Sequence, residues 1–476
     1  MDRRSFFKIF GGATVASSSL LAACKGKDSA QQTTAELQEP PTDKMTLRTN
    51  HNTGDKVSIL GYGMMRLPML PKKEETDEDV IDQEMVNKQV DYALAHGVNY
   101  YDTSPAYCQG KSESATGIAL HHHDRKSYYV ATKLSNFAPQ TWTREGSQEM
   151  FRKSMEYLQV DYIDYLLLHA IGGTSRDLNG NELDSHQTFN ARYMDNGILD
   201  WLVEQKKVGK IRNLGFSYHG DIAIFDMLLK WHDEGRYHWD FVQIELNYLE
   251  WDFADEINKR NTDASYLYNE LHKRNIPGVI MEPLLGGRLA NVPDPIVAKM
   301  KERRPEDSVA SWAFRYAGTP EGILTVLSGM TYMEHLKENI GTYAPLEPIT
   351  KEEDAFLQEI AKEIYDLKSI PCTGCQYCMP CPYGIDIPAI FSHYNKMIKE
   401  GTMPHHRESE EYTRQRRAFL IGYDRSVPRL RQADHCIGCG ECESHCPQRI
   451  RIPKQMQQID VMVENLKRNG VIEDKE

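Results

Sequence analysis

Short β-rich runs alternate with helical stretches along most of the chain, and this alternation constrains the fold more than any other feature. Seven of the intervals carry apolar residues at helical spacing. Eight strand–helix units suit a (β/α)8 barrel, whose usual length is about 250 residues. We therefore predict an α/β fold, a (β/α)8 TIM barrel over residues 45–349, with its chemistry at the C-terminal ends of the strands. The eight runs are VSIL, VNYYDTS, YYVATKL, IDYLLLHA, IRNLGFS, FVQIELN, GVIMEPL and ILTVLSG.

Eight of the ten cysteines fall in two short runs near the C-terminus. The first run is C-x2-C-x2-C-x2-C-P and the second is C-x2-C-x2-C-x3-C-P. The second spacing is typical of bacterial two-cluster ferredoxins, in which the fourth cysteine ligates the other cluster. Cysteines at every third residue converge on one point, whereas disulfides need pairs that face each other. The spacing thus predicts two [4Fe-4S] clusters, one held by Cys372, Cys375, Cys378 and Cys446, the other by Cys436, Cys439, Cys442 and Cys381.

The segments between the two cysteine runs carry apolar residues at helical spacing, as in IPAIFSHYNKMIKEG and SEEYTRQRRAFLIGY. We predict that residues 350–476 form a mainly α-helical, ferredoxin-like domain. Two four-cysteine zinc sites remain an alternative, although zinc ribbons usually pair two C-x2-C units without a trailing Cys-Pro. Such a domain serves either electron transfer or structural support.

Four polar residues stand where predicted barrel strands end: Asp102 and Tyr107 in YYDTSPAY, Lys133 in VATKL and His169 in LLLHA. With these residues in place, the barrel resembles the aldo-keto reductases over its whole length. The five-residue step from Asp102 to Tyr107 is the most specific part of the resemblance. It implies an oxidoreductase that interconverts a carbonyl and an alcohol with NADP or NAD.

The resemblance assigns a role to each of the four residues. Tyr107 would be the acid in reduction and the base in oxidation, and a free tyrosine with a pKa of about 10 is a sluggish donor near neutrality. Lys133 would lower the pKa of Tyr107 through its positive charge, with Asp102 fixing the lysine. His169 would donate a hydrogen bond that orients the substrate oxygen.

Cofactor residues carry over less completely from the family. Tyr218, Met281 and His335 stand where many members have an asparagine, a tyrosine and an arginine. The preference between NADP and NAD is therefore open. The polar segment after His169 resembles a substrate loop, and a disordered connection is the alternative. The expected cofactor-binding residues are Ser217, Gln243, Met281, Pro283, Leu284, Gly286, Glu338 and Asn339.

The N-terminus reads MDRRSFFKIF and reaches LLAAC at Cys24. This resembles a twin-arginine export signal with a lipoprotein processing site, residues 1–24, followed by a polar linker, residues 25–44. We expect export of the folded, cluster-loaded protein to the cell envelope of a bacterium, with membrane attachment by lipid at Cys24. Without such a signal, the protein would stay in the cytoplasm.

A net charge of -13 argues against a nucleic-acid partner, because phosphate binding needs a basic face. Three functions remain. The first is an oxidoreductase whose clusters exchange electrons with a one-electron partner. The second is a plain NAD(P)H-dependent carbonyl reductase with structural clusters. The third is a non-enzymatic electron-transfer lipoprotein on a retired barrel.

Overall fold

The computed structural model describes residues 39–468, apart from 72–78, 257–260, 368, 405–410, 447 and 449. The predicted signal and most of the linker lie outside these described residues. Residues from Glu39 onward belong to one compact unit. Among the described helices, none combines the length and the apolar character needed to cross a membrane.

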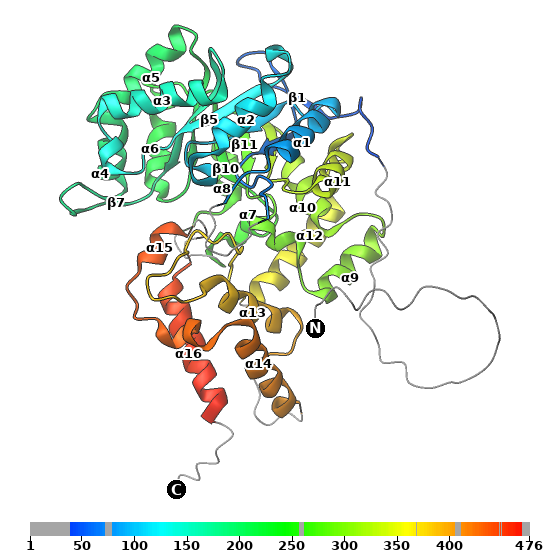
Figure 1. The fold of residues 1–476 in the computed structure, drawn as a ribbon. Helices are drawn as coiled ribbons and strands as arrows, with labels where there is room; N and C mark the ends of the chain where they lie inside the picture. The colour runs from blue at the N-terminus through cyan, green and yellow to red at the C-terminus, as the bar shows by residue number, and fades with distance from the viewer. Residues whose placement is uncertain are drawn as a thin grey trace, which may run out of the picture. The chain divides into compact units, whose positions relative to one another are not determined.

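Eight parallel strands close into a barrel, which confirms the predicted fold (Figure 1). Each strand pairs with its two neighbours, and β12 pairs with β3 to complete the circle. Parallel strands bring all their C-terminal ends to the same rim of the barrel. In barrel order they are β3 (Leu60–Gly63), β4 (Tyr100–Asp102), β5 (Tyr129–Leu134), β6 (Ile163–Ile171), β9 (Ile211–Tyr218), β10 (Phe241–Glu245), β11 (Gly278–Met281) and β12 (Ile323–Ser328).

The predicted first strand, VSIL, is divided between two sheets. β1 (Leu47–Thr49) and β2 (Lys56–Ser58) form an antiparallel hairpin outside the barrel, and β3 begins only at Leu60. The Ser58 hydroxyl donates to the Leu60 carbonyl at 2.7 Å where the chain passes from one sheet to the other. Val57 packs in a buried cluster with Tyr100 and other residues of the barrel strands. The residues next to these in sequence belong to the larger cluster between the strands and the helices. The hairpin therefore closes the end of the barrel that lies away from the rim.

Helices pack around the strands, and capping side chains fix where several of them begin. Asp82 accepts from the Met85 backbone N–H, Thr143 from that of Gly146, and Ser308 from that of Ser311. The longer helices of this layer are α1 (Gln83–Ala95), α2 (Ser112–Leu120), α3 (Arg144–Leu158), α5 (Ile198–Lys207), α6 (Ile222–Asp233), α8 (Ala264–Lys273), α9 (Asp294–Arg303), α10 (Val309–Gly318) and α11 (Met333–Tyr343).

One further helix, α12 (Lys351–Asp366), packs into the core of the barrel although the sequence places it after the expected boundary at residue 349. Its apolar residues, among them Phe356, Leu357 and Ile360, belong to the same buried cluster as the barrel helices. A capping box at Thr350 begins the helix, and Glu353 also binds Arg315 of α10 at 2.8 Å. The helix is thus the last element of the barrel and not the first of the cluster domain.

A separate apolar core begins at Ile370 and supports the cysteine runs. As predicted, the region is helical, and the two segments between the cysteine runs are α13 (Ile387–Lys399) and α14 (Tyr412–Ser426). Short α15 (Glu441–His445) and long α16 (Ile452–Arg468) follow. Residues of α13, α14 and α16 form most of this core, because each presents one apolar face to the others.

Candidate active site and cluster-binding cysteines

The barrel topology brings the four predicted catalytic residues to one place. Asp102 ends β4, Lys133 lies near the end of β5, and His169 lies near the end of β6. These three strands are consecutive in the barrel. Tyr107 opens the turn η1 (Tyr107–Gly110) that follows β4. The four side chains therefore surround one patch of the rim.

The lysine of this site is held beneath the tyrosine. Lys133 Nζ lies 2.5 Å from Asp102 Oδ1 and donates to the Thr103 carbonyl at 2.8 Å. It also lies 4.7 Å from the centre of the Tyr107 ring. The other Asp102 carboxylate oxygen is buried and has no hydrogen-bond partner. The Lys133–Asp102 pair is thus fixed below the Tyr107 ring, which covers the lysine ammonium.

Burial is the largest influence on the pKa values of Lys133 and Tyr107. It lowers the pKa of Lys133, which the Asp102 carboxylate opposes. It also raises the pKa of Tyr107 well above its ordinary value, with Asp102 and Glu282 adding to the effect. The lowering of the Tyr107 pKa expected from Lys133 stays a prediction, because burial and the carboxylates of Asp102 and Glu282 set the net direction. Burial away from water penalises the tyrosinate, which is the charged form of the side chain.

His169 is held by contacts on both sides. Its Nδ1 lies 2.6 Å from the Ser135 hydroxyl, and Arg192 donates to its backbone carbonyl at 2.6 Å. Burial, together with the positive charges of Lys133 and Arg192, lowers the pKa of His169 well below its ordinary value. The neutral imidazole has one donor nitrogen, and when Ser135 donates to Nδ1 the proton sits on Nε2.

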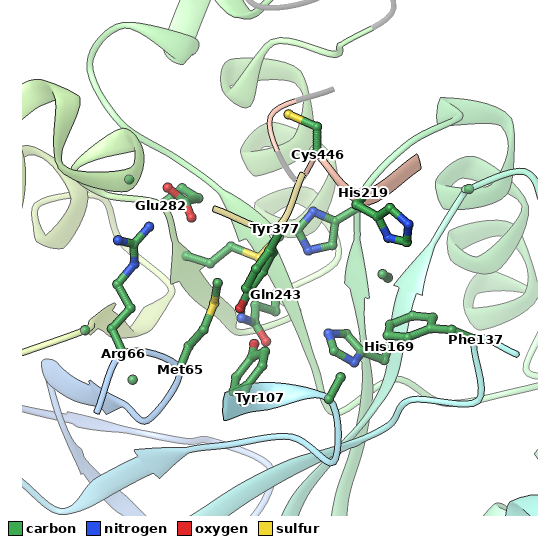
Figure 2. A pocket seen from close by; sticks show the side chains of 18 of the residues that line it. Met65, Arg66, Tyr107, Phe137, His169, His219, Gln243, Glu282, Tyr377 and Cys446 are labelled. Carbon is green, nitrogen blue, oxygen red and sulfur yellow. The ribbon is translucent and has the colours of Figure 1, made fainter. Parts of the chain in front are cut away.

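A cleft of about 2070 Å³ opens over these residues (Figure 2). The segment after His169 forms one of its walls, and its role as a substrate loop stays a prediction. This segment is ordered into the hairpin β7 (Ser175–Arg176) and β8 (Glu182–Leu183), followed by α4 (Ser185–Phe189). Gly173, Leu183 and Gln187 are among its contributions to the cleft.

The same cleft collects all but one of the expected cofactor residues. Ser217 does not line it and instead accepts a hydrogen bond from the Ala170 backbone N–H at 2.8 Å. Two of the expected cofactor residues in the cleft keep buried oxygens without a partner, Gln243 Oε1 and Glu338 Oε1. Unsatisfied buried polar atoms are uncommon in native proteins and indicate a missing partner. The lining residues of the expected set are Gln243, Met281, Pro283, Leu284, Gly286, Glu338 and Asn339.

The sequence interpretation missed Glu282, which lines the cleft between two expected cofactor residues. Its backbone has φ +54°, a left-handed conformation that costs energy in a non-glycine residue. Its Oε2 is buried without a partner. Burial and the nearby Glu245 raise its pKa, and Arg66 on the same side of the cleft opposes this (Figure 2). A charged residue directly after the apolar strand GVIM was the signal that could have revealed it.

The cysteines gather as two groups. Cys372, Cys375, Cys378 and Cys446 line one small hollow, together with apolar residues such as Phe391 and Ile450. Burial raises the pKa of Cys372 to about 11 and that of Cys378 to about 12, with the neighbouring cysteines, Cys446 included, adding to both.

The second group is formed by the remaining four cysteines of the two runs. Burial raises the pKa of Cys442 to about 11, and Cys436, Cys439 and Cys381 add to the effect. Within the described part of the chain, no three His, Cys, Asp or Glu side chains converge on a point suited to a single metal ion. The thiols of the first group surround a shared hollow, and those of the second lie close enough to influence the pKa of Cys442. Four thiolates are the ligand set of a [4Fe-4S] cluster.

Comparisons with known proteins agree with both parts of the architecture. Residues 59–362 match the aldo/keto reductase family, and residues 371–451 match the 4Fe-4S dicluster domain. L-galactose dehydrogenase of Arabidopsis thaliana is 25% identical over 345 residues, which cover 69% of this chain and 97% of that protein. YqkF, an uncharacterized oxidoreductase of Bacillus subtilis, is 25% identical over 307 residues. That alignment covers 58% of this chain and 87% of YqkF.

Among solved structures, an aldo-keto reductase of Bacillus halodurans in its holo form aligns with a TM-score of 0.49 and 23% identity. The alignment covers 66% of this chain and 96% of that one. The fold and the site together define a barrel oxidoreductase that carries an iron–sulfur dicluster domain. The chain belongs to the aldo/keto reductase family.

Proposed function

We propose that the protein interconverts a carbonyl and an alcohol at the barrel rim with a nicotinamide cofactor, while two [4Fe-4S] clusters exchange electrons with a one-electron partner. The observation that carries the proposal is the Lys133–Asp102 pair beneath Tyr107, in the same cleft as His169 and the unpartnered Gln243 oxygen. The aldo/keto reductase match supports the reaction class, and the dicluster match supports the clusters.

In the reductive direction, Tyr107 gives its hydroxyl proton to the substrate oxygen. The raised pKa of Tyr107 keeps the hydroxyl protonated until the substrate arrives, as an acid requires. His169 donates a hydrogen bond to the same oxygen and so holds the carbonyl carbon in a fixed orientation. As the proton leaves Tyr107, the nearby Lys133 stabilises the tyrosinate.

A nicotinamide ring supplies or accepts the hydride at the substrate carbon when it is bound. The residues fit such a group at two places. Gln243 Oε1, on β10, suits the amide of the ring, since it is a buried acceptor without a donor. Glu338 Oε1, on α11, is a second unpartnered acceptor and suits ribose or adenine donors.

The two cysteine groups would hold the clusters, which supply one-electron transfer when present. The carbonyl–alcohol reaction transfers two electrons, and two clusters carry one electron each. The proposal therefore includes an external one-electron partner that exchanges these electrons with the clusters. If the clusters are structural, the protein is a plain carbonyl reductase. If the barrel is inactive, only electron transfer remains.

Small sugars are the first substrates to test, because a relative that this chain covers along 97% of its length is a sugar dehydrogenase by name. The cleft also presents polar groups, including Glu282, Arg66 and His219, that can bind hydroxyl groups (Figure 2).

The decisive experiment is anaerobic purification with iron, sulfide and nucleotide assayed on one sample, followed by turnover of aldoses and simple aldehydes. We expect about eight iron atoms per chain, from two four-iron clusters, and turnover that depends on NADP(H) or NAD(H). A change of the cluster redox state on adding substrate supports the coupled reaction. Turnover without such a change favours the plain reductase, and no turnover with intact clusters favours the electron-transfer protein.

A further inference from the structure

The wall of the catalytic cleft is built partly by the cluster domain. Besides barrel residues, the cleft is lined by Tyr377 and by residues 439–441, 443, 445 and 446. Tyr377 lies between two predicted ligands of the first cluster, Cys375 and Cys378. The loop that binds the first cluster therefore also faces the place where the carbonyl would react.

Close contacts hold this loop on the barrel. Thr373 packs on Gly286, where an added Cβ would lie only 2.2 Å from the threonine methyl. Gly286 also has φ +63°, so a larger residue is disfavoured there on both counts. Next to it, Arg288 donates to the Ser369 hydroxyl at 2.9 Å and pairs with Glu256 at 2.6 Å. These contacts fix the cysteine loop at the cleft.

The Tyr377 side chain enters the cleft. Figure 2 shows its hydroxyl directed toward Tyr107 and Gln243, with Cys446 on the side away from the hydroxyl. The preceding residue, Gln376, has φ +64°, an uncommon conformation for a non-glycine residue that turns the loop. Tyr377 is 43% exposed, although it lines the same cleft as Tyr107. The exposed part of the ring is thus available to a bound molecule.

We propose that Tyr377 is a specificity-determining residue of the carbonyl–alcohol site, which limits substrate size and ties the substrate site to the first cluster. The proposal rests on the proposed function, because it assigns a residue to that reaction. Its ring lines the cleft with the hydroxyl directed toward Tyr107 (Figure 2), so a large substrate that reaches Tyr107 meets this ring. The predicted cluster ligands Cys375 and Cys378 lie on either side of Tyr377 in the sequence. A substrate that contacts Tyr377 therefore also changes the surroundings of the first cluster.

The first test is the size profile of turnover, measured anaerobically on the cluster-loaded full chain with glyceraldehyde, arabinose, galactose and maltose. Tyr377→Ala should raise kcat/KM for the largest sugars by about tenfold or more relative to glyceraldehyde, since steric rejection in a pocket is worth about that much. Tyr377→Phe should keep the profile of the unaltered protein. Tyr383→Ala is the matched control, because Tyr383 directly follows the same cysteine run, is 46% exposed and does not line the cleft.

The second test does not need turnover. The paramagnetic resonance spectrum of the reduced protein is recorded with and without saturating arabinose or galactose. The signal of the first cluster should change with sugar in the unaltered protein and in Tyr383→Ala, and change less in Tyr377→Ala.

The outcomes separate this inference from the proposed function. If the unaltered protein converts sugars but Tyr377→Ala has the same size profile, the inference is wrong and the proposed function stands. If no sugar is converted, the proposed function fails for this class. The spectra then decide the inference: a sugar-induced change that needs Tyr377 supports it, and unchanged spectra overturn it.

Discussion

Lys133 Nζ contacts Asp102 Oδ1 at 2.5 Å, and the side chains of both residues are at most 3% exposed. A buried pair of this kind leaves an uncompensated charge when either member is removed. The pair also lies under Tyr107, which connects its protonation to the chemistry of the tyrosine. Two consequences for turnover follow from this geometry.

Replacing Tyr107 by Phe should reduce turnover by about a hundred- to ten-thousand-fold, the usual contribution of acid–base catalysis. The fold, both clusters and any bound nucleotide should remain, because only one hydroxyl is lost at the rim. Steady-state rates under anaerobic conditions measure the effect. Turnover equal to that of the unaltered protein would show that the family resemblance extends to the fold alone.

Replacing Lys133 by Met should shift the pH profile of the oxidative direction toward alkaline pH. Tyrosinate is the base in that direction, and the loss of a neighbouring cation raises the pKa of the tyrosine. A higher pKa means that a higher pH is needed for the same fraction of tyrosinate. An unshifted profile would contradict the role of Lys133, provided that circular dichroism shows a folded variant.

Replacing Glu282 by Gln should tighten nucleotide binding by about 1 kcal/mol, a few-fold in Kd, because it removes a negative charge from the cleft wall. The pKa of Glu282 is raised, so its charge appears as the pH rises, and affinity in the unaltered protein should fall with rising pH. The variant should lose this dependence. Calorimetric titration measures both, with Glu334→Gln of exposed Glu334 as the control. Weaker binding would show instead that Glu282 accepts hydrogen bonds from the cofactor.

Replacing Cys446 by Ser should damage the cluster held by the Cys372 triplet and leave the cluster of the Cys436 triplet mostly intact. Cys446 lines the hollow of the former group although it is nearer in sequence to the latter. Paramagnetic resonance that resolves the two clusters distinguishes them. Selective loss of the Cys436 cluster would exclude the crossed ligand sets.

Replacing Glu250 by Gln should make stability less dependent on pH. Glu250 is buried and accepts from Asn247 at 2.6 Å, and burial raises its pKa well above 4.5. The native state therefore holds the proton more tightly than the unfolded chain. Stability is fully present below the unfolded pKa and falls as pH rises toward the native pKa, by about 1.4 kcal/mol for each pKa unit between them.

Chemical denaturation at several pH values tests this expectation. The difference in unfolding free energy between Glu250→Gln and the unaltered protein should increase in favour of the variant above pH 4.5. Glu359→Gln, at an exposed position of α12, is the control and should show no such trend. A pH-independent difference would mean that Glu250 has the same pKa in the native and the unfolded states.

Local patterns in the sequence were sufficient for the barrel, for the helices between the cysteine runs and for the candidate residues at the strand ends. Strand and helix periodicities are local properties, and a residue that ends a parallel barrel strand must lie at the rim. The cysteine spacing likewise indicated ligand sets directly.

Only the tertiary structure showed that VSIL is divided at Ile59, that α12 belongs to the barrel core, and that Glu282 and Tyr377 face the catalytic cleft. Each of these depends on contacts between residues far apart in the chain. The pKa of Tyr107 is the clearest case, because its direction is decided by burial under neighbouring elements, while the sequence reveals only the lysine that opposes it. Sequence spacing specifies which groups can meet, and packing decides how much water remains around them.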